Sequence, residues 1–242
     1  MSLPRLRSPR APAMGLVLLW ALSGAAGAQA VEVSPATRAA QVDLIDVATL
    51  APDVVADMRY AGAHNFTGAP VPGYAAPVCL LLSPAARALA AVQEDLRAQG
   101  LRLKLLDCYR PVRAVERFVQ WARDLGDQRT KPEFYPNLDK AALLGDYIAE
   151  TSGHSRGATV DLTLLRCEGG RCEELDMGTP FDFFDTRANT DSPLAGPTQR
   201  QHRQQLVAAM ARHGFANYPM EWWHFTYRPE PTPNTAYDVP VE

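Results

Sequence analysis

After its first thirty residues, the chain has no long hydrophobic run. No later stretch approaches the roughly 20 consecutive apolar residues that a membrane-spanning helix needs. Strong net charge is also missing, since the 242 residues carry a formal charge of only −3. A chain with so little positive charge is a poor candidate for non-specific binding to nucleic acid or to anionic membranes. We therefore expect neither kind of partner.

The first thirty residues have the features of a secretory signal. Arg5, Arg7 and Arg10 form a basic start, residues 14–28 are mostly apolar, and residues 28–30 (A-Q-A) offer a small-residue cleavage site. Cleavage of 30 residues from the 242 would leave 212 and, because three Arg are lost, change the net charge from −3 to −6. We expect an exported protein, periplasmic or secreted, that does not contact the membrane after signal removal. An uncleaved anchor stays open as the alternative, because the start is long and rich in Pro.

One domain is enough to account for the remaining chain. Residues 31–42 have the composition of a loose leader, and residues 229–242 form a Pro-rich tail. No internal repeat or low-complexity tract interrupts the residues between them. The folded domain is accordingly expected over 43–228.

Cysteine is scarce, with four residues in the whole chain. In an exported protein, pairing of these residues is the default. Cys167 and Cys172 flank the turn-forming sequence E-G-G-R, which would bring them together across a hairpin. Elimination then pairs Cys79 with Cys108. A zinc knuckle is the rival interpretation, although the C-x4-C spacing has no second C-x2-C to complete it.

Helical and extended patterns alternate irregularly along the domain. Ser83 and Pro84 predict a helix start, with Ser83 as N-cap and Pro84 at the first helical position, and Gly100 predicts its end. Hydrophobic periodicity predicts helices over 83–100, 112–126 and 198–213, and strands over 101–105, 158–165 and 215–227. Because there is no regular βαβ repeat, we predict an α+β fold: a single domain with a central, largely antiparallel sheet flanked by helices.

Two of the five histidines stand in unusual surroundings. His154 lies between glycines in S-G-H-S-R-G, which allows a tight backbone entry into the following strand. On that strand, Asp161 faces the side opposite Val160 and Leu162. A buried carboxylate is costly unless positive charge meets it, and a metal shared with His154 would supply that charge. A salt bridge to an Arg is the alternative.

His224 ends the motif E-W-W-H, whose two indoles would keep water away from the site. In a continuous strand Glu221 and His224 would point to opposite faces, so a joint role requires the backbone to bend, which Pro219 would allow. Two His and one Asp form a ligand set suited to catalytic zinc, with a fourth position left for water. Glu221 is then the candidate to take a proton from that water.

A family resemblance rests on several motifs taken together. The motifs are S-G-H-S-R-G-A-T-V-D, E-W-W-H, D-C-Y-R-P, M-R-Y-A with N-F-T-G, and M-G-T-P-F-D-F-F-D. As a set they are similar to those of the VanX-type D-alanyl-D-alanine dipeptidases, a branch of the zinc D,D-peptidases, and they cover most of residues 43–228. The resemblance implies hydrolysis of a small D-dipeptide. It also implies that one zinc ion per chain is bound by His154, Asp161 and His224, with Glu221 as the general base.

The resemblance also assigns roles outside the metal site. It implies that Arg110, in Y-R-P, stabilises the oxyanion that forms when the peptide carbonyl is attacked; one fixed donor contributes about 2.7–4 kcal/mol in such a role. Ser152 and Tyr60 are implied to bind substrate, and Asp182 to receive its free ammonium group. Resistance-type members act on a cytoplasmic pool of D-Ala-D-Ala. An export signal fits the breakdown of cell-wall-derived D-dipeptides outside the cytoplasm better.

Three other functions remain open. A D,D-carboxypeptidase acting on peptidoglycan stem peptides would use the same site on a different substrate. The sequence G-H-S-R-G also matches the nucleophile elbow of serine hydrolases, but an elbow needs a helix after Ser155, where the pattern predicts a strand. A cell-wall-binding module with structural zinc would have no reason for a base beside His224. The carboxypeptidase is therefore the main alternative.

Overall fold

The computed structural model describes Met1 and residues 31–242. The predicted signal segment, apart from Met1, lies outside the described residues. Across 31–242, no helix is long and apolar enough to cross a membrane.

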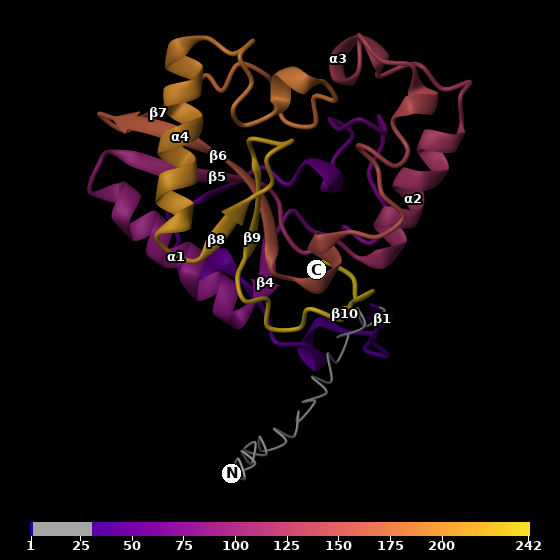
Figure 1. The fold of residues 1–242 in the computed structure, drawn as a ribbon, viewed down its shortest axis with the longest axis horizontal. Helices are drawn as coiled ribbons and strands as arrows, with labels where there is room; N and C mark the ends of the chain where they lie inside the picture. Colours follow the sequence, from indigo (N-terminus) through magenta and orange to yellow (C-terminus); the bar gives the residue numbers. More distant parts are fainter. Residues whose placement is uncertain (2–30) are drawn as a thin grey trace.

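A six-stranded sheet forms the centre of the fold (Figure 1). Its strand order is β3-β5-β6-β9-β8, with β7 paired to β6, and every pair is antiparallel except β3 with β5. The strands are β3 (Val55–Ala56), β5 (Leu101–Asp107), β6 (Thr159–Glu168), β7 (Arg171–Glu174), β8 (Phe215–Asn217) and β9 (His224–Tyr227). The predicted α+β class with a largely antiparallel sheet is confirmed.

The burial of the two central strands, β5 and β6, can be compared with their sequence patterns. In β5, Leu101, Leu103 and Leu105 are buried, whereas the intervening Arg102 and Lys104 are only half-buried, as strict alternation predicts. By contrast, β6 is buried on both faces from its start through residue 165. It is a central strand, paired with β5 on one side and with β9 and β7 on the other. A carboxylate on such a strand is therefore placed in the interior.

Helices cover both sides of this sheet. Figure 1 shows α1 and α4 together on one side and α2 on the other. The helices are α1 (Ser83–Arg97), α2 (Val112–Arg123), α3 (Lys131–Phe134) and α4 (Pro197–Ala211). The predicted N-cap is wrong by one residue: Leu82 occupies that position and Ser83 is the first helical residue. The Ser83 hydroxyl accepts a hydrogen bond from Arg87, one turn further on, instead of capping the helix.

The predicted strand over 215–227 is two strands joined by a turn. Phe215–Asn217 forms β8 and His224–Tyr227 forms β9, and they pair antiparallel. The amide of Glu221 donates to the carbonyl of Tyr218, and the amide of His224 donates to that of Glu221, at 3.0 and 3.3 Å. These local bonds replace the strand ladder, so the backbone bends between Glu221 and His224 as a joint role requires.

Two short sheets complete the fold. They pair β2 (Leu44–Asp46) with β4 (Leu80–Leu82) and β1 (Glu32–Val33) with β10 (Thr235–Ala236). The Pro-rich tail packs onto the domain: Val239 and Val241 are buried, and the carbonyl of Val241 accepts from the amide of Ala75 at 2.8 Å. Apolar side chains spaced two apart thus give the tail a buried face despite its prolines.

Both disulfides have the predicted pairing. Cys79 is bonded to Cys108, and Cys167 to Cys172, so none of the four cysteines is free. Cys167 and Cys172 are directly opposite residues of the β6–β7 hairpin, which explains why a five-residue separation can be bridged. The zinc knuckle is thereby excluded, because its ligands would be thiolates.

Candidate metal centre and its pocket

His154 is held in a short 3-10 turn, Gly153–Arg156, which is separated from the start of β6 by two residues. The hydroxyl of Ser152 caps this turn by accepting from the amide of His154 at 3.2 Å. Gly157 ends it with φ +71°, and a Cβ there would lie 3.0 Å from the side chain of Leu82. Glycine is therefore required where the chain reverses into β6, and this reversal places His154 beside the strand that it precedes.

Asp161 and His224 are neighbours because of strand register. They are directly opposite residues of the antiparallel pair β6 and β9, so their side chains project from the same face of the sheet. Asp161 is 2% exposed. Trp222 and Trp223, next to His224, are each 1% exposed and exclude solvent from this part of the fold.

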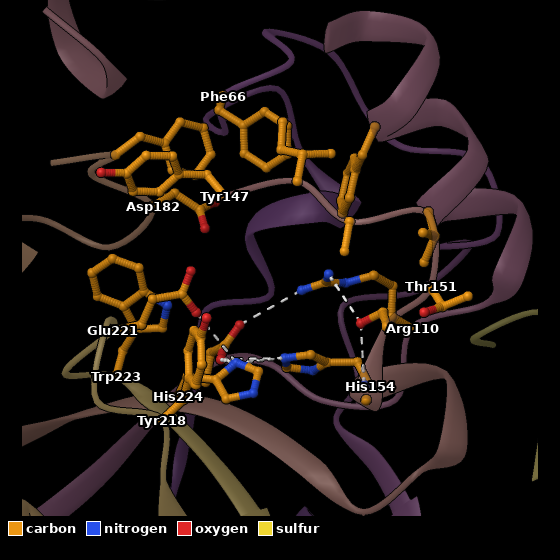
Figure 2. A pocket seen from close by; sticks show the side chains of 18 of the residues that line it. Phe66, Arg110, Tyr147, Thr151, His154, Asp182, Tyr218, Glu221, Trp223 and His224 are labelled. Atoms are coloured by element: carbon orange, nitrogen blue, oxygen red, sulfur yellow. Dashed lines mark hydrogen bonds and ion pairs between the residues drawn. The ribbon is translucent and has the colours of Figure 1, made fainter. Parts of the chain in front are cut away.

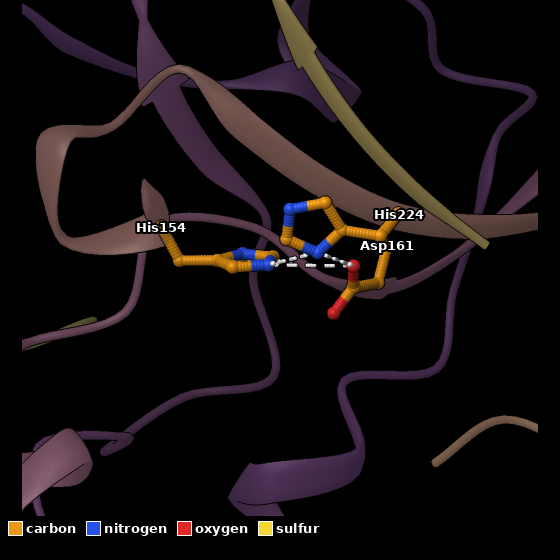
Figure 3. A group of neighbouring side chains, drawn as sticks. All are labelled: His154, Asp161 and His224. Atoms are coloured by element: carbon orange, nitrogen blue, oxygen red, sulfur yellow. Dashed lines mark hydrogen bonds and ion pairs between the residues drawn. The ribbon is translucent and has the colours of Figure 1, made fainter. Parts of the chain in front are cut away.

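One donor atom from each of these three side chains converges on a single point (Figure 3). Asp161 Oδ1 lies 3.3 Å from His154 Nε2 and 3.1 Å from His224 Nδ1. The two ring nitrogens are 3.3 Å apart. Ligand atoms bonded at about 2.0 Å to a tetrahedral ion are separated by about 3.3 Å, so the triangle fits three corners of such a site.

Hydrogen bonding and charge at the triangle also suit a cation. Asp161 Oδ1 is buried and accepts no hydrogen bond within residues 31–242. His154 Nδ1 donates to the carbonyl oxygen of Cys108 at 2.7 Å, which leaves the lone pair of Nε2 directed at the triangle. Burial alone would raise the pKa of Asp161, but the His154 and His224 rings hold that pKa below its usual range. The carboxylate thus requires positive charge beside it.

Glu221 stands beside the triangle without belonging to it. Its Oε2 is 3.4 Å from His224 Nδ1, and 18% of its side chain is exposed. Burial raises the pKa of Glu221 to about 7, partly opposed by His224 and reinforced by Asp161. A carboxylate with a pKa near neutrality is suited to taking up and releasing a proton.

Arg110 is fixed on the other side of Asp161. Its Nε and Nη2 donate to Asp107 Oδ2 at 2.9 and 2.8 Å, and Nη2 lies 3.7 Å from Asp161 Oδ2. The guanidinium packs over the rings of Tyr60 and Phe118 at 5.2 and 5.0 Å from their centroids. Although burial alone would lower it, the pKa of Arg110 is raised, with Asp107 as the main cause. The side chain is therefore charged and has little freedom to reorient.

Asp182 is a buried carboxylate at the opposite end of the pocket. It is 5% exposed, and it accepts a hydrogen bond from the Tyr60 hydroxyl at 2.9 Å. Burial, with Asp161 second, raises the pKa of Asp182 well above its usual range. It is also the one non-glycine residue with positive φ, at +58°, among the described residues. Backbone strain of this kind is typical of functional positions.

These side chains enclose a cavity of about 250 Å³ (Figure 2). All eight predicted site residues outside the disulfides line it: Tyr60, Arg110, Ser152, His154, Asp161, Asp182, Glu221 and His224. Apolar walls come from Phe66, Val115, Phe118 and Phe184. The volume is below the roughly 300–1,000 Å³ of typical ligand pockets, so the site suits a small molecule.

Two parts of the site were not predicted from the sequence. Asp107 is fully buried and accepts from Arg110 and from the Tyr74 hydroxyl, the latter at 2.6 Å. Its position three residues before Arg110, at the end of an apolar strand, was a usable signal for a local ion pair. The second part is the rim segment 145–149, for which the sequence offers no periodicity or motif.

Comparisons with known proteins agree on one family. A family model of peptidase family M15, described as D-ala-D-ala dipeptidase, matches residues 40–242. A D-alanyl-D-alanine dipeptidase of Enterococcus faecium is 40% identical over 187 residues, which are 77% of this chain and 92% of the relative. One of Streptomyces coelicolor is 41% identical over 76% of this chain and 91% of its own length. One of Escherichia coli is 34% identical over 76% and 83%.

Proposed function

Because the chain belongs to the D-Ala-D-Ala dipeptidase family of metallopeptidases, we propose that it cleaves D-alanyl-D-alanine with one zinc ion bound by His154, Asp161 and His224 and with Glu221 as general base. The observation that carries the metal assignment is the triangle of donor atoms separated by 3.1–3.3 Å.

The donor set favours zinc. Two imidazoles and one carboxylate, with a fourth position directed at the pocket, are the ligands of many catalytic zinc sites. The ion would act as a Lewis acid that polarises the scissile carbonyl and acidifies water. The protein supports it through the Cys108 carbonyl, which fixes the tautomer of His154.

We assign the proton transfers to Glu221. The reaction adds water across the peptide bond: hydroxyl goes to the carbonyl carbon, and hydrogen goes to the departing amine nitrogen. Glu221 accepts a proton from the attacking water and returns it to that nitrogen as the carbon–nitrogen bond breaks. The position of its Oε2, 3.4 Å from His224 Nδ1, puts the carboxylate next to the metal ligands without using it as one.

We assign to Arg110 the stabilisation of the charge that develops on the carbonyl oxygen. Its guanidinium faces the triangle and is held by Asp107, so the donor needs no reorganisation during the reaction. Ser152 Oγ lies 3.4 Å from Arg110 Nη1 and can share in holding the substrate.

The far end of the cavity suits an ammonium group. Asp182 and the Tyr60 hydroxyl form a buried polar pair there, 2.9 Å apart, among aromatic side chains. An incoming ammonium would give the carboxylate a counter-charge and stabilise its ionised form. A small cavity that offers a counter-charge to the N-terminal ammonium of the substrate favours a free dipeptide over the stem peptide that a D,D-carboxypeptidase would use.

This preference is testable with Asp182→Asn and N-acetyl-D-Ala-D-Ala. We expect the wild type to prefer the free dipeptide, and the substitution to lower kcat/KM for that substrate by on the order of 10–100-fold, since a hydrogen bond to a charged group is worth about 1.5–3 kcal/mol. The acetylated substrate, which lacks the ammonium, should be almost unaffected by the substitution. Asp139→Asn, which changes an exposed acid outside the cavity, is the control and should leave kcat/KM for both substrates unchanged. Equal turnover of both substrates by the wild type would support the carboxypeptidase instead.

We also propose that the chain acts outside the cytoplasm, on D-dipeptides released from the cell wall. The pairing of all four cysteines supports an oxidising compartment. Protein recovered from the exported fraction should begin near Val31, and none of its thiols should react without denaturation. N-terminal sequencing and thiol titration check this. A full-length cytoplasmic chain with titratable thiols would contradict the proposal.

A further inference from the structure

The segment 107–110 joins the two halves of the site. Its Cys108 carbonyl accepts the 2.7 Å hydrogen bond from His154 Nδ1, and its Arg110 amide donates to the His154 carbonyl at 3.3 Å. The same four residues include Asp107, which holds the Arg110 guanidinium. A shift of this segment would therefore move a metal ligand and the cationic side chain together.

Regular structure fixes only the first residue of the segment, Asp107, which pairs with Asp161 across β5 and β6. Strand β5 ends at Asp107, and its register against β6 shifts between Leu105 and Asp107. Beyond that point the backbone leaves the sheet. The amide of Tyr109 donates to the carbonyl of Leu80 at 2.9 Å, and Cys108 is bonded covalently to Cys79.

The other end of that covalent bond is firmly placed. Cys79 directly precedes β4, which pairs with β2, and its carbonyl accepts from the amide of Val47 at 2.9 Å. The bond thus ties the residue whose carbonyl orients His154 to a second sheet. Both cysteines are almost fully buried, at 2% and 1% exposure, so a reductant in solution cannot reach the bond in the folded protein.

We propose that the Cys79–Cys108 disulfide is a positioning element of the metal centre: by fixing the Cys108 carbonyl, it sets the orientation of His154 and so the affinity for the metal. This role rests on the proposed function of His154 as a ligand. It differs from general stabilisation, because it predicts weaker metal binding in protein that is still folded.

The second disulfide is a matched control. Cys167–Cys172 joins β6 to β7 at the exposed end of their hairpin, and the amide of Cys167 donates to the carbonyl of Gly100 and not to a residue of the site. Removal of either disulfide by two Cys→Ala substitutions makes the same chemical change, the loss of two sulfur atoms and one covalent bond. Only removal of the buried one should affect the metal.

The test compares Cys79→Ala/Cys108→Ala with Cys167→Ala/Cys172→Ala in the full mature chain. Zinc affinity is measured by competition with a chromophoric chelator, well below the Tm of each variant, after near-ultraviolet circular dichroism has shown native packing. Loss of support for a ligating His typically weakens metal binding 10–100-fold, and we expect a loss of about 10-fold, since the carbonyl is loosened rather than deleted. The control should bind zinc like the wild type. Excess zinc should restore most of the lost activity, which it could not do for a misfolded chain.

Wild-type affinity in the Cys79→Ala/Cys108→Ala variant would overturn the proposal, even if its Tm falls. If that variant does not fold, Cys79→Val/Cys108→Ala keeps more of the buried volume without the covalent bond, and the same comparison applies. Absence of zinc from the wild type and the control as well would contradict the proposed function itself. Zinc bound equally by all three proteins would contradict only the positioning role.

Discussion

Replacement of Glu221 with Gln is expected to lower kcat by roughly 10²–10⁴-fold, the usual contribution of a general base. The substitution keeps the size of the side chain but removes its ability to accept and return a proton. Because Glu221 stands beside the ligand triangle and not in it, the variant should retain its zinc. Steady-state kinetics with D-Ala-D-Ala and metal analysis of the same preparation measure both quantities, and KM should change far less than kcat.

The pH dependence adds an independent readout. A base must be deprotonated to act, so activity falls as the pH drops through its pKa. Burial raises the pKa of Glu221 to about 7, and a nearby divalent cation would lower that value. The wild type should therefore lose kcat/KM on the acidic side of neutrality, and Glu221→Gln should lack this limb. Near-normal turnover by the Gln variant would contradict the proposed mechanism while leaving the metal site intact.

Substitution of a proposed metal ligand should have the other large effect. His154→Ala, Asp161→Ala or His224→Ala each removes one of three donors, and we expect each variant to lose most of its zinc and nearly all activity together. Elemental analysis after gel filtration measures the metal content. Dialysis of the wild type against a chelator should abolish activity, and zinc should restore it.

The remaining histidines provide controls for the ligand substitutions. His64 is paired with Glu133 at 2.7 Å, His202 contacts the carbonyl of Asp176, and His213 is paired with Asp95, all outside the cavity. Replacement of His202 with Ala should leave zinc content and kcat unchanged. Stoichiometric zinc in all three ligand variants would contradict the metal assignment, whatever their activity.

Much of the fold could be predicted from local pattern. The alternation over 101–105 and the helical spacing over 112–126 and 198–213 correspond to β5, α2 and α4, with ends that differ by a few residues. Periodicity over 215–227 predicted one strand, because aromatic residues fit both a strand and a buried turn. The bend before His224 was expected only from the joint role of Glu221 and His224, and the structure has it. Strands of two or three residues, such as β3 and β10, are too short to show any periodicity.

The candidate site, like the fold, was predicted in part from the sequence. Residue types indicated the candidate metal ligands and the candidate base Glu221, since few side chains bind zinc or accept protons near neutral pH. The spacing of Asp107 and Arg110 indicates at most a local ion pair, because an acid at a strand end is usually solvated. Only the complete burial of Asp107 between Arg110 and Tyr74 shows that it holds the guanidinium in place.

The sequence by itself determined the chemistry that is available: which residues can ligate, donate or pair, and which strands must be buried. These properties follow from side-chain type and short-range period. Only the tertiary structure decided proximity. His154 and His224 are 70 positions apart and meet because β9 pairs with β6 in one register, and a slip of one residue would turn His224 to the other face. The carbonyl that orients His154 belongs to Cys108, 46 positions away, and backbone groups are the same in every residue, so no sequence pattern could have assigned it.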